Sequence, residues 1–278
     1  MATTSTAVPP AGGSPAPERP PARARLVHMF SVLFRTPRRP RFIAEVALVA
    51  LGYGLYSLIR NAVPDVETEA IARSLSIWKF EQGLGIDFEL WLNHTMHAVN
   101  WLTVTANYFY ATMHFIVTIA VLAWLFWHHP GRYRAARTVL AFTTGLALIG
   151  YFVFPLAPPR LLPDGPFFDT VVLHDTWGSM ASGDLQNLSN QYAAMPSMHA
   201  GWSLWCGIAI VMFAQRRWVR ILGILYPLAT LIVITATANH YVLDAVGGWA
   251  TLALGFGLQT LLHGRPVSAF HRDVMAVT

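Results

Sequence analysis

Long apolar stretches dominate the pattern along the chain and predict helices that cross a membrane. About 20 consecutive apolar residues are needed for a helix to span a hydrocarbon core of about 30 Å. Six segments meet or approach that length, namely 42–62, 100–127, 135–157, 197–214, 218–237 and 241–262. No charge separates Ile221 from Leu243, so we expect a turn near Asn239 to divide the last two segments. The pattern predicts an all-α integral membrane protein built as a six-helix transmembrane bundle.

Two of the connections are too long to be simple turns. Residues 63–97 carry an amphipathic pattern, which predicts short helices lying at the membrane interface. Residues 158–196 contain five prolines and four acids and are expected to form an extracytoplasmic loop or lid. The predicted organisation is a disordered, basic N-terminal region over 1–41, a membrane domain over 42–263 and a short tail over 264–278.

Composition agrees with the apolar pattern. The 278 residues are 54% hydrophobic and 12% charged, whereas charged residues make up roughly a quarter of a soluble domain, which excludes a water-soluble globular protein. The net charge of +5 would elsewhere suggest a nucleic-acid partner. With both termini in the cytoplasm, however, 15 of the 19 basic residues fall on the cytoplasmic side and 10 of the 14 acids fall outside. We therefore expect no nucleic-acid partner and a multi-pass protein of the cell membrane.

Ionisable residues are scarce in the predicted spans, and four that lie in or beside them converge on the outer membrane level. His240 and Asp244 are four residues apart, so their side chains share one face of a helix. A carboxylate that holds one imidazole nitrogen leaves the other nitrogen as a base or nucleophile. His199 opens the fourth span, and Arg160 lies just beyond the third. By itself the His240–Asp244 pair would also fit a structural hydrogen bond inside a bundle.

This set of residues suits phosphoryl transfer. Arg160 could hold an anionic phosphate through two hydrogen bonds, and the first amides of the fourth helix could bind it together with the Ser197 hydroxyl. One histidine could attack phosphorus while the other protonates the leaving oxygen. The acids that could chelate a metal are scattered through loops, so we predict no metal site and no cofactor.

At these residues the chain resembles a known family. Pro196-Ser197-Met198-His199, paired with His240-Tyr241-Val242-Leu243-Asp244 and two following glycines, is similar to the type 2 phosphatidic acid phosphatase superfamily. The similarity covers about residues 65–262 and is closest to the inositol phosphorylceramide synthase branch. The resemblance implies six spans, an extracytoplasmic site and a metal-independent phosphohistidine intermediate. It implies that His240 is the nucleophile, Asp244 its orienting partner and His199 the general acid and then base.

The chain departs from the family pattern in two places. Val233 and Ile234 stand where the phosphatase pattern has a serine and an arginine. Val153 stands where it has a lysine, and Leu161 follows Arg160 where it has a proline. Arg160 is thus the one candidate left from the phosphate-binding trio. These departures favour a transferase over a simple phosphatase.

Three functional hypotheses follow. The leading one is a lipid phosphotransferase that moves a phosphoryl group or a phosphorylated headgroup, with inositol phosphate among the candidates, from a lipid phosphate or phospholipid donor in the bilayer to an alcohol or sugar acceptor. The first alternative is a phosphatase acting on polyprenyl or phosphatidyl phosphate. The second, from a different class, is a membrane transporter or binder without catalysis.

Overall fold

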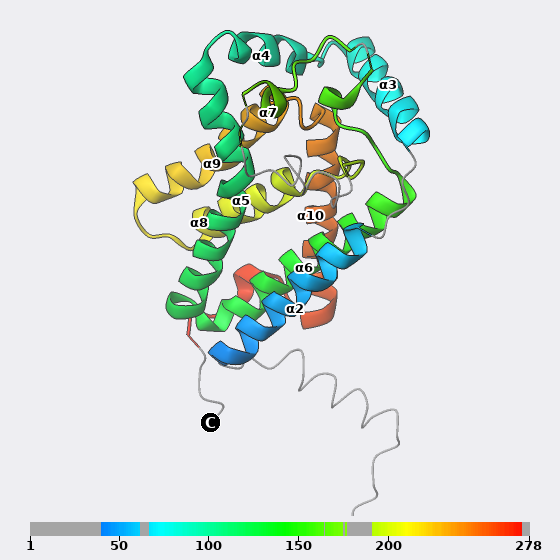
Figure 1. Ribbon diagram of the computed structural model, residues 1–278. Helices are drawn as coiled ribbons and strands as arrows, with labels where there is room; N and C mark the ends of the chain where they lie inside the picture. The colour runs from blue at the N-terminus through cyan, green and yellow to red at the C-terminus, as the bar shows by residue number, and fades with distance from the viewer. Residues whose placement is uncertain (1–39, 62–66, 164, 175, 177–190, 274–278) are drawn as a thin grey trace, which may run out of the picture. The chain divides into compact units, whose positions relative to one another are not determined.

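The computed structural model describes residues 40–273 apart from 62–66, 164, 175 and 177–190 (Figure 1). Within those residues the regular structure is helical, with one isolated parallel bridge between Leu156 and Ala193. The all-α prediction is therefore confirmed for the described part of the chain. The predicted N-terminal region 1–41 lies outside it except for residues 40 and 41.

Each of the six predicted apolar segments forms a helix. The helices are α2 (Phe42–Asn61), α5 (Asn100–His128), α6 (Pro130–Val153), α8 (Met198–Phe213), α9 (Arg217–Ala236) and α10 (Val242–His263). Over the described residues, four of them are long and apolar enough to cross a membrane, namely α5, α6, α9 and α10. The apolar parts of α2 and α8, Phe42–Leu58 and Met198–Phe213, are shorter. The protein is a helical membrane protein with four candidate spans, and the count of six stays a prediction.

The largest difference from the predicted bounds is at α6. This helix begins at Pro130, five residues before the predicted start, and ends at Val153, four residues before the predicted end. Proline is favoured in the first turn, where its missing N–H is not needed. The helix ends because Phe154 precedes Pro155, and a residue before proline is disfavoured in the helical conformation.

The two long connections gather at one end of the bundle. Residues 63–97 contain α3 (Glu67–Leu84) and α4 (Phe88–His97), which lie at the end where α5 and α10 begin (Figure 1). The described part of 158–196 contains a short 3-10 helix, η2 (Pro159–Leu161), and one turn of helix, α7 (Thr170–Leu173). Asn93 on α4 fixes this loop, because its amide accepts a hydrogen bond from the Phe168 amide at 2.8 Å and donates one to the Phe168 carbonyl at 3.1 Å.

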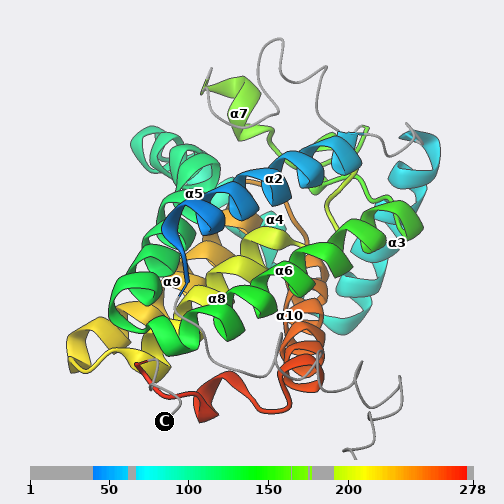
Figure 2. The same cartoon turned by 90° about the horizontal axis from the view of Figure 1, so that it is seen from below.

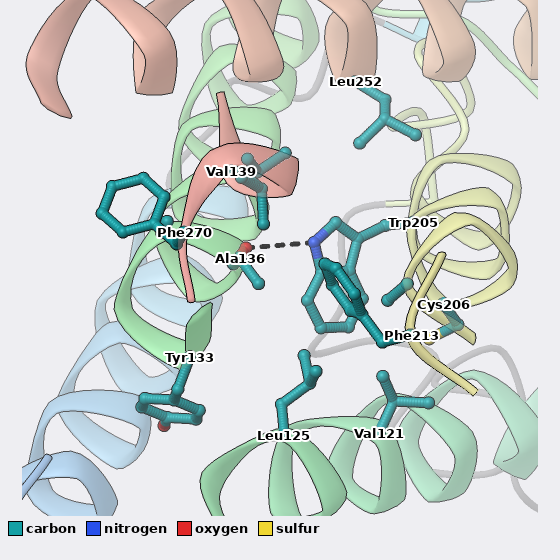
Figure 3. Close-up of a cluster of buried hydrophobic side chains, with 13 residues drawn as sticks. Val121, Leu125, Tyr133, Ala136, Val139, Trp205, Cys206, Phe213, Leu252 and Phe270 are labelled. Carbon is teal, nitrogen blue, oxygen red and sulfur yellow. Dashed lines mark hydrogen bonds between the residues drawn. The ribbon is translucent and has the colours of Figure 1, made fainter. Parts of the chain in front are cut away.

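Helix α8 lies among its neighbours and carries the centre of the core. It contacts α5, α6, α9 and α10 (Figure 2). Trp205 on α8 is almost fully buried, and its Nε1 donates to the Ala136 carbonyl on α6 at 3.0 Å (Figure 3). Large apolar side chains on the outside of α9, including Leu222, Leu225 and Leu228, are exposed. A buried centre with an apolar exterior is what a helix bundle in lipid requires.

Candidate functional site

His240 and Asp244 meet at the start of α10. The Oδ2 atom of Asp244 lies 3.3 Å from Nδ1 of His240 and accepts a hydrogen bond from the Tyr241 amide at 2.9 Å. His240 is 5% exposed and Asp244 is fully buried. With its proton on Nδ1, His240 donates to Asp244 and keeps a lone pair on Nε2. That Nε2 atom is buried and has no hydrogen-bond partner within the described part of the chain.

The turn between α9 and α10 places His240. It lies at the position expected from the sequence, and Ala238 adopts a left-handed conformation with φ 52°. This conformation is rare for a residue with a Cβ atom and is maintained only where the surroundings fix it. Here the Ala238 carbonyl accepts from the Arg160 amide at 3.0 Å, and the His240 amide donates to the Ile234 carbonyl at 3.1 Å. The strained turn therefore ties the nucleophile candidate to the segment that carries Arg160.

His199 faces His240 from α8. It is the second residue of that helix, and its ring centroid lies 5.6 Å from that of His240. The His199 ring stacks on Tyr110 at 4.2 Å and contacts the edge of His114 at 4.2 Å. His114 also makes a 3.0 Å contact from Nδ1 to the Tyr110 carbonyl. The two site histidines are close enough for one phosphate to contact both rings.

Ser197 joins the two helices that carry these histidines. Its hydroxyl accepts from the Ala200 amide at 3.3 Å as the N-cap of α8, and its amide donates to the Asp244 carbonyl at 2.8 Å. A Cβ atom at Gly248 would lie 2.2 Å from the Ser197 carbonyl oxygen. The glycine after the second motif is thus needed for the close approach of α8 and α10. The hydroxyl acts as a helix cap here, and its contact with phosphate stays a prediction.

Arg160 lies in η2 beside the turn that carries His240, with its side chain 4% exposed. Its Nη1 atom donates to Asp169 Oδ2 at 3.0 Å and its Nε atom donates to Asn239 Oδ1 at 3.0 Å. A longer contact of 3.4 Å joins Nη2 to Gln191. The structure therefore brings Arg160 to the site but pairs it with an acid. The Asp169 and Asn239 partners were not predicted, although Asn239 directly precedes His240 and Asp169 lies in the same proline-rich loop.

Two further acids reach this end of α10. Glu81 on α3 and Glu89 on α4 have no exposed surface. Neither residue was predicted, because the amphipathic pattern of 63–97 does not show which of its acids face inward. The Oε1 atom of Glu81 accepts a hydrogen bond from the Leu243 amide at 2.6 Å.

Within the described residues, no group of three or more His, Cys, Asp or Glu side chains is arranged to hold a metal ion. Comparison with protein families gives one match. The model of the PAP2 superfamily matches residues 75–258, a segment that includes Arg160, His199, His240 and Asp244. No curated protein and no solved structure matches the chain.

Proposed function

From the finding that the chain belongs to the PAP2 superfamily, whose members are typically phosphatases or phosphotransferases, we propose that it is a membrane lipid phosphotransferase working through a phosphohistidine at His240. The observation that carries the proposal is the arrangement of His240, with Asp244 on Nδ1 and the His199 ring 5.6 Å away. A nucleophile, its orienting partner and a second proton-transfer group are the parts that covalent phosphoryl transfer needs.

The reaction runs in two steps. In the first, Nε2 of His240 attacks phosphorus, a P–N bond forms, and the P–O bond to the lipid alcohol breaks. Protonated His199 gives its proton to the leaving oxygen, and Asp244 stabilises the positive charge on the His240 ring. In the second, neutral His199 takes the proton of the acceptor hydroxyl, whose oxygen attacks phosphorus as the P–N bond breaks. The enzyme then returns to its starting state. The reaction is hydrolysis when the acceptor is water and transfer when the acceptor is an alcohol.

The charges around Arg160 favour a phosphodiester donor. Asp169 already neutralises the guanidinium at 3.0 Å. A phosphate monoester carries a charge of about −1.5 to −2 near neutral pH because its second pKa is about 6, whereas a diester carries one negative charge. A cation that is already paired with an acid suits the single charge better. This supports transfer of a phosphorylated headgroup, with inositol phosphate among the candidates, to an alcohol or sugar acceptor.

The runner-up is a lipid phosphate phosphatase, and headgroup exchange separates the two. Purified protein in mixed micelles would receive phosphatidylinositol labelled in the headgroup, or labelled phosphatidic acid, with and without a diacylglycerol acceptor. We expect exchange of the labelled headgroup into the added diacylglycerol. Release of inorganic phosphate from phosphatidic acid without headgroup exchange would favour the phosphatase. A transporter or binder would give neither product.

We further propose that α2 and α8 complete a six-span bundle with the site on the extracytoplasmic side of the cell membrane. The positive-inside distribution of arginines supports this orientation. Gln82 on α3 is exposed, as is Arg217 at the start of α9. With Cys206 replaced by alanine, Gln82→Cys should react with an impermeant maleimide in intact cells, and Arg217→Cys should react only after lysis. The reverse pattern would put the site on the cytoplasmic side.

A further inference from the structure

The proposed reaction does not use two buried glutamates that lie at the end of the bundle where α10 begins. Glu81 and Glu89 come from different helices, α3 and α4, and neither has exposed surface. Burial and the negative charge of Asp244 raise the pKa of both carboxyl groups, and neither Oε2 of Glu81 nor either carboxyl oxygen of Glu89 has a hydrogen-bond partner within the described residues. Glu81 also accepts the Leu243 amide at 2.6 Å. Leu243 precedes Asp244, so Glu81 holds the backbone from which the Asp244 side chain projects.

The surroundings of the pair are acidic. The other titratable groups that interact with the two glutamates are Asp87, Asp244 and the Tyr241 phenol. Tyr241 OH is itself within 2.7 Å of Ser74 Oγ. Buried carboxylates without a cation are costly, and such groups keep their protons instead. The pKa of Glu81 is raised to about 9, first by burial and then by the Glu89 carboxyl. The hydrogen bond from the Leu243 amide lowers this pKa but does not outweigh them. Burial raises the pKa of Glu89 as well.

We propose that Glu81 and Glu89 are positioning residues for the His240–Asp244 pair: both hold protons at neutral pH, Glu81 fixes the Leu243 amide, and Asp244 is left as the carboxylate that orients His240. This role rests on the proposed function of His240. Were the glutamates ionised, two further negative charges would share the buried end of α10 with Asp244. As acids both are neutral, and Glu81 still accepts the hydrogen bond from the Leu243 amide.

Glutamine and alanine variants distinguish this positioning role from a requirement for a charged carboxylate. Glutamine keeps the size of glutamate and the acceptor oxygen but has no charge, so it imitates the protonated acid. Alanine removes the acceptor of the Leu243 amide. With phosphatidylinositol and phosphatidic acid in mixed micelles as probes, we expect Glu81→Gln and Glu89→Gln to keep kcat within about threefold of wild type. Glu81→Ala should lower kcat by about tenfold or more with KM nearly unchanged. Gln82→Ala, at an exposed neighbour on α3, is the control.

A second measurement needs no substrate. A buried acid whose folded-state pKa is above its unfolded value makes the protein less stable as the pH rises from about 4.5 toward about 9, because only the folded chain keeps the proton. Glutamine does not titrate. The melting temperature of Glu81→Gln relative to wild type should therefore increase between pH 5 and pH 9. If Glu81→Ala does not fold, this comparison of melting temperatures still tests the proposal.

The outcomes distinguish the two proposals. A loss of kcat in Glu81→Gln as large as in Glu81→Ala would mean that the charge matters and would overturn the proposal, as would a pH-independent difference in melting temperature. Wild-type kcat in folded Glu81→Ala would overturn the positioning role while the proposed function stands. Failure of the wild-type chain to form phosphohistidine from either probe would instead overturn the proposed function.

Discussion

The Oδ2 atom of Asp244 is shared between Nδ1 of His240 at 3.3 Å and the Tyr241 amide at 2.9 Å. One buried oxygen thus orients the proposed nucleophile and satisfies an amide at the start of α10. Asp244→Asn keeps the size of the side chain but removes the charge that stabilises a positive His240 ring. We expect kcat to fall roughly 10²- to 10⁴-fold with little change in KM. Steady-state kinetics on a variant with a wild-type melting temperature tests this, and a loss below threefold would contradict it.

Arg160 and Asp169 make a second testable pair. Lysine in place of Arg160 keeps the charge but cannot form two parallel hydrogen bonds with a phosphate. We expect Arg160→Lys to lower kcat/KM by about 10²-fold, mainly through KM if Arg160 binds donor and transition state alike.

Asp169→Asn is the matched variant for Arg160→Lys. Asp169 Oδ1 also accepts the Val171 and Val172 amides at 3.1 and 3.2 Å, and asparagine can keep that cap. Removing the charge that competes with phosphate should change kcat/KM by less than about tenfold and lower KM. An Asp169→Asn loss equal to that of Arg160→Lys would show that the ion pair itself is needed.

Gly248 tests the contact between α8 and α10. A methyl group there would lie 2.2 Å from the Ser197 carbonyl, so the two helices must move apart. We expect Gly248→Ala to lower the free energy of unfolding by about 1–3 kcal/mol and to reduce kcat, because the shift separates His199 from His240. Gly257 on the same helix has nothing within 4 Å of its virtual Cβ atom. Gly257→Ala should keep full activity, and equal effects of the two variants on melting temperature would refute the packing argument.

His129, at the other end of the bundle, is expected to make the folded protein less stable in acid. It lies between α5 and α6 and is 6% exposed. Burial first, then Arg132 and Arg272, lower the pKa of His129 to about 4. Below about pH 6.5 the unfolded chain takes up a proton that the folded chain refuses, so stability falls as the pH drops from about 6.5 to about 4. His129→Gln removes this contribution. Its melting temperature relative to wild type should rise on acidification, and a constant difference would contradict the assignment.

The helices could be predicted from the sequence because apolar length alone specifies them. The contact of His240 with Asp244 could also be predicted, since four residues is one turn of helix. That His199 lies near His240 could be inferred only from the predicted membrane topology together with the motif shared with the family. The pairing of Arg160 with Asp169 could not be predicted, because it depends on how an irregular loop folds.

The burial of Glu81 and Glu89 could not be predicted from the sequence pattern. Both belong to helices in which acids and apolar residues alternate closely, so the sequence does not say which acid faces inward. Their burial depends on the packing of α3 against α10 and of α4 against α9 and α5, which is a tertiary property. The prediction of six spans has the same limit. The apolar parts of α2 and α8 are shorter than a full span, and whether these helices cross the membrane depends on the helices around them.

The most direct test of the central claim is to trap phosphate on His240. The wild-type chain, His240→Asn and His199→Asn would each be mixed with phosphatidylinositol or phosphatidic acid, quenched in alkali and digested for mass spectrometry. We predict an acid-labile phosphate or inositol phosphate adduct on His240 in the wild type, none at that position in His240→Asn, and slowed formation in His199→Asn. Turnover of either lipid with no adduct on His240 at any quench time, or undiminished turnover by His240→Asn, would contradict the account.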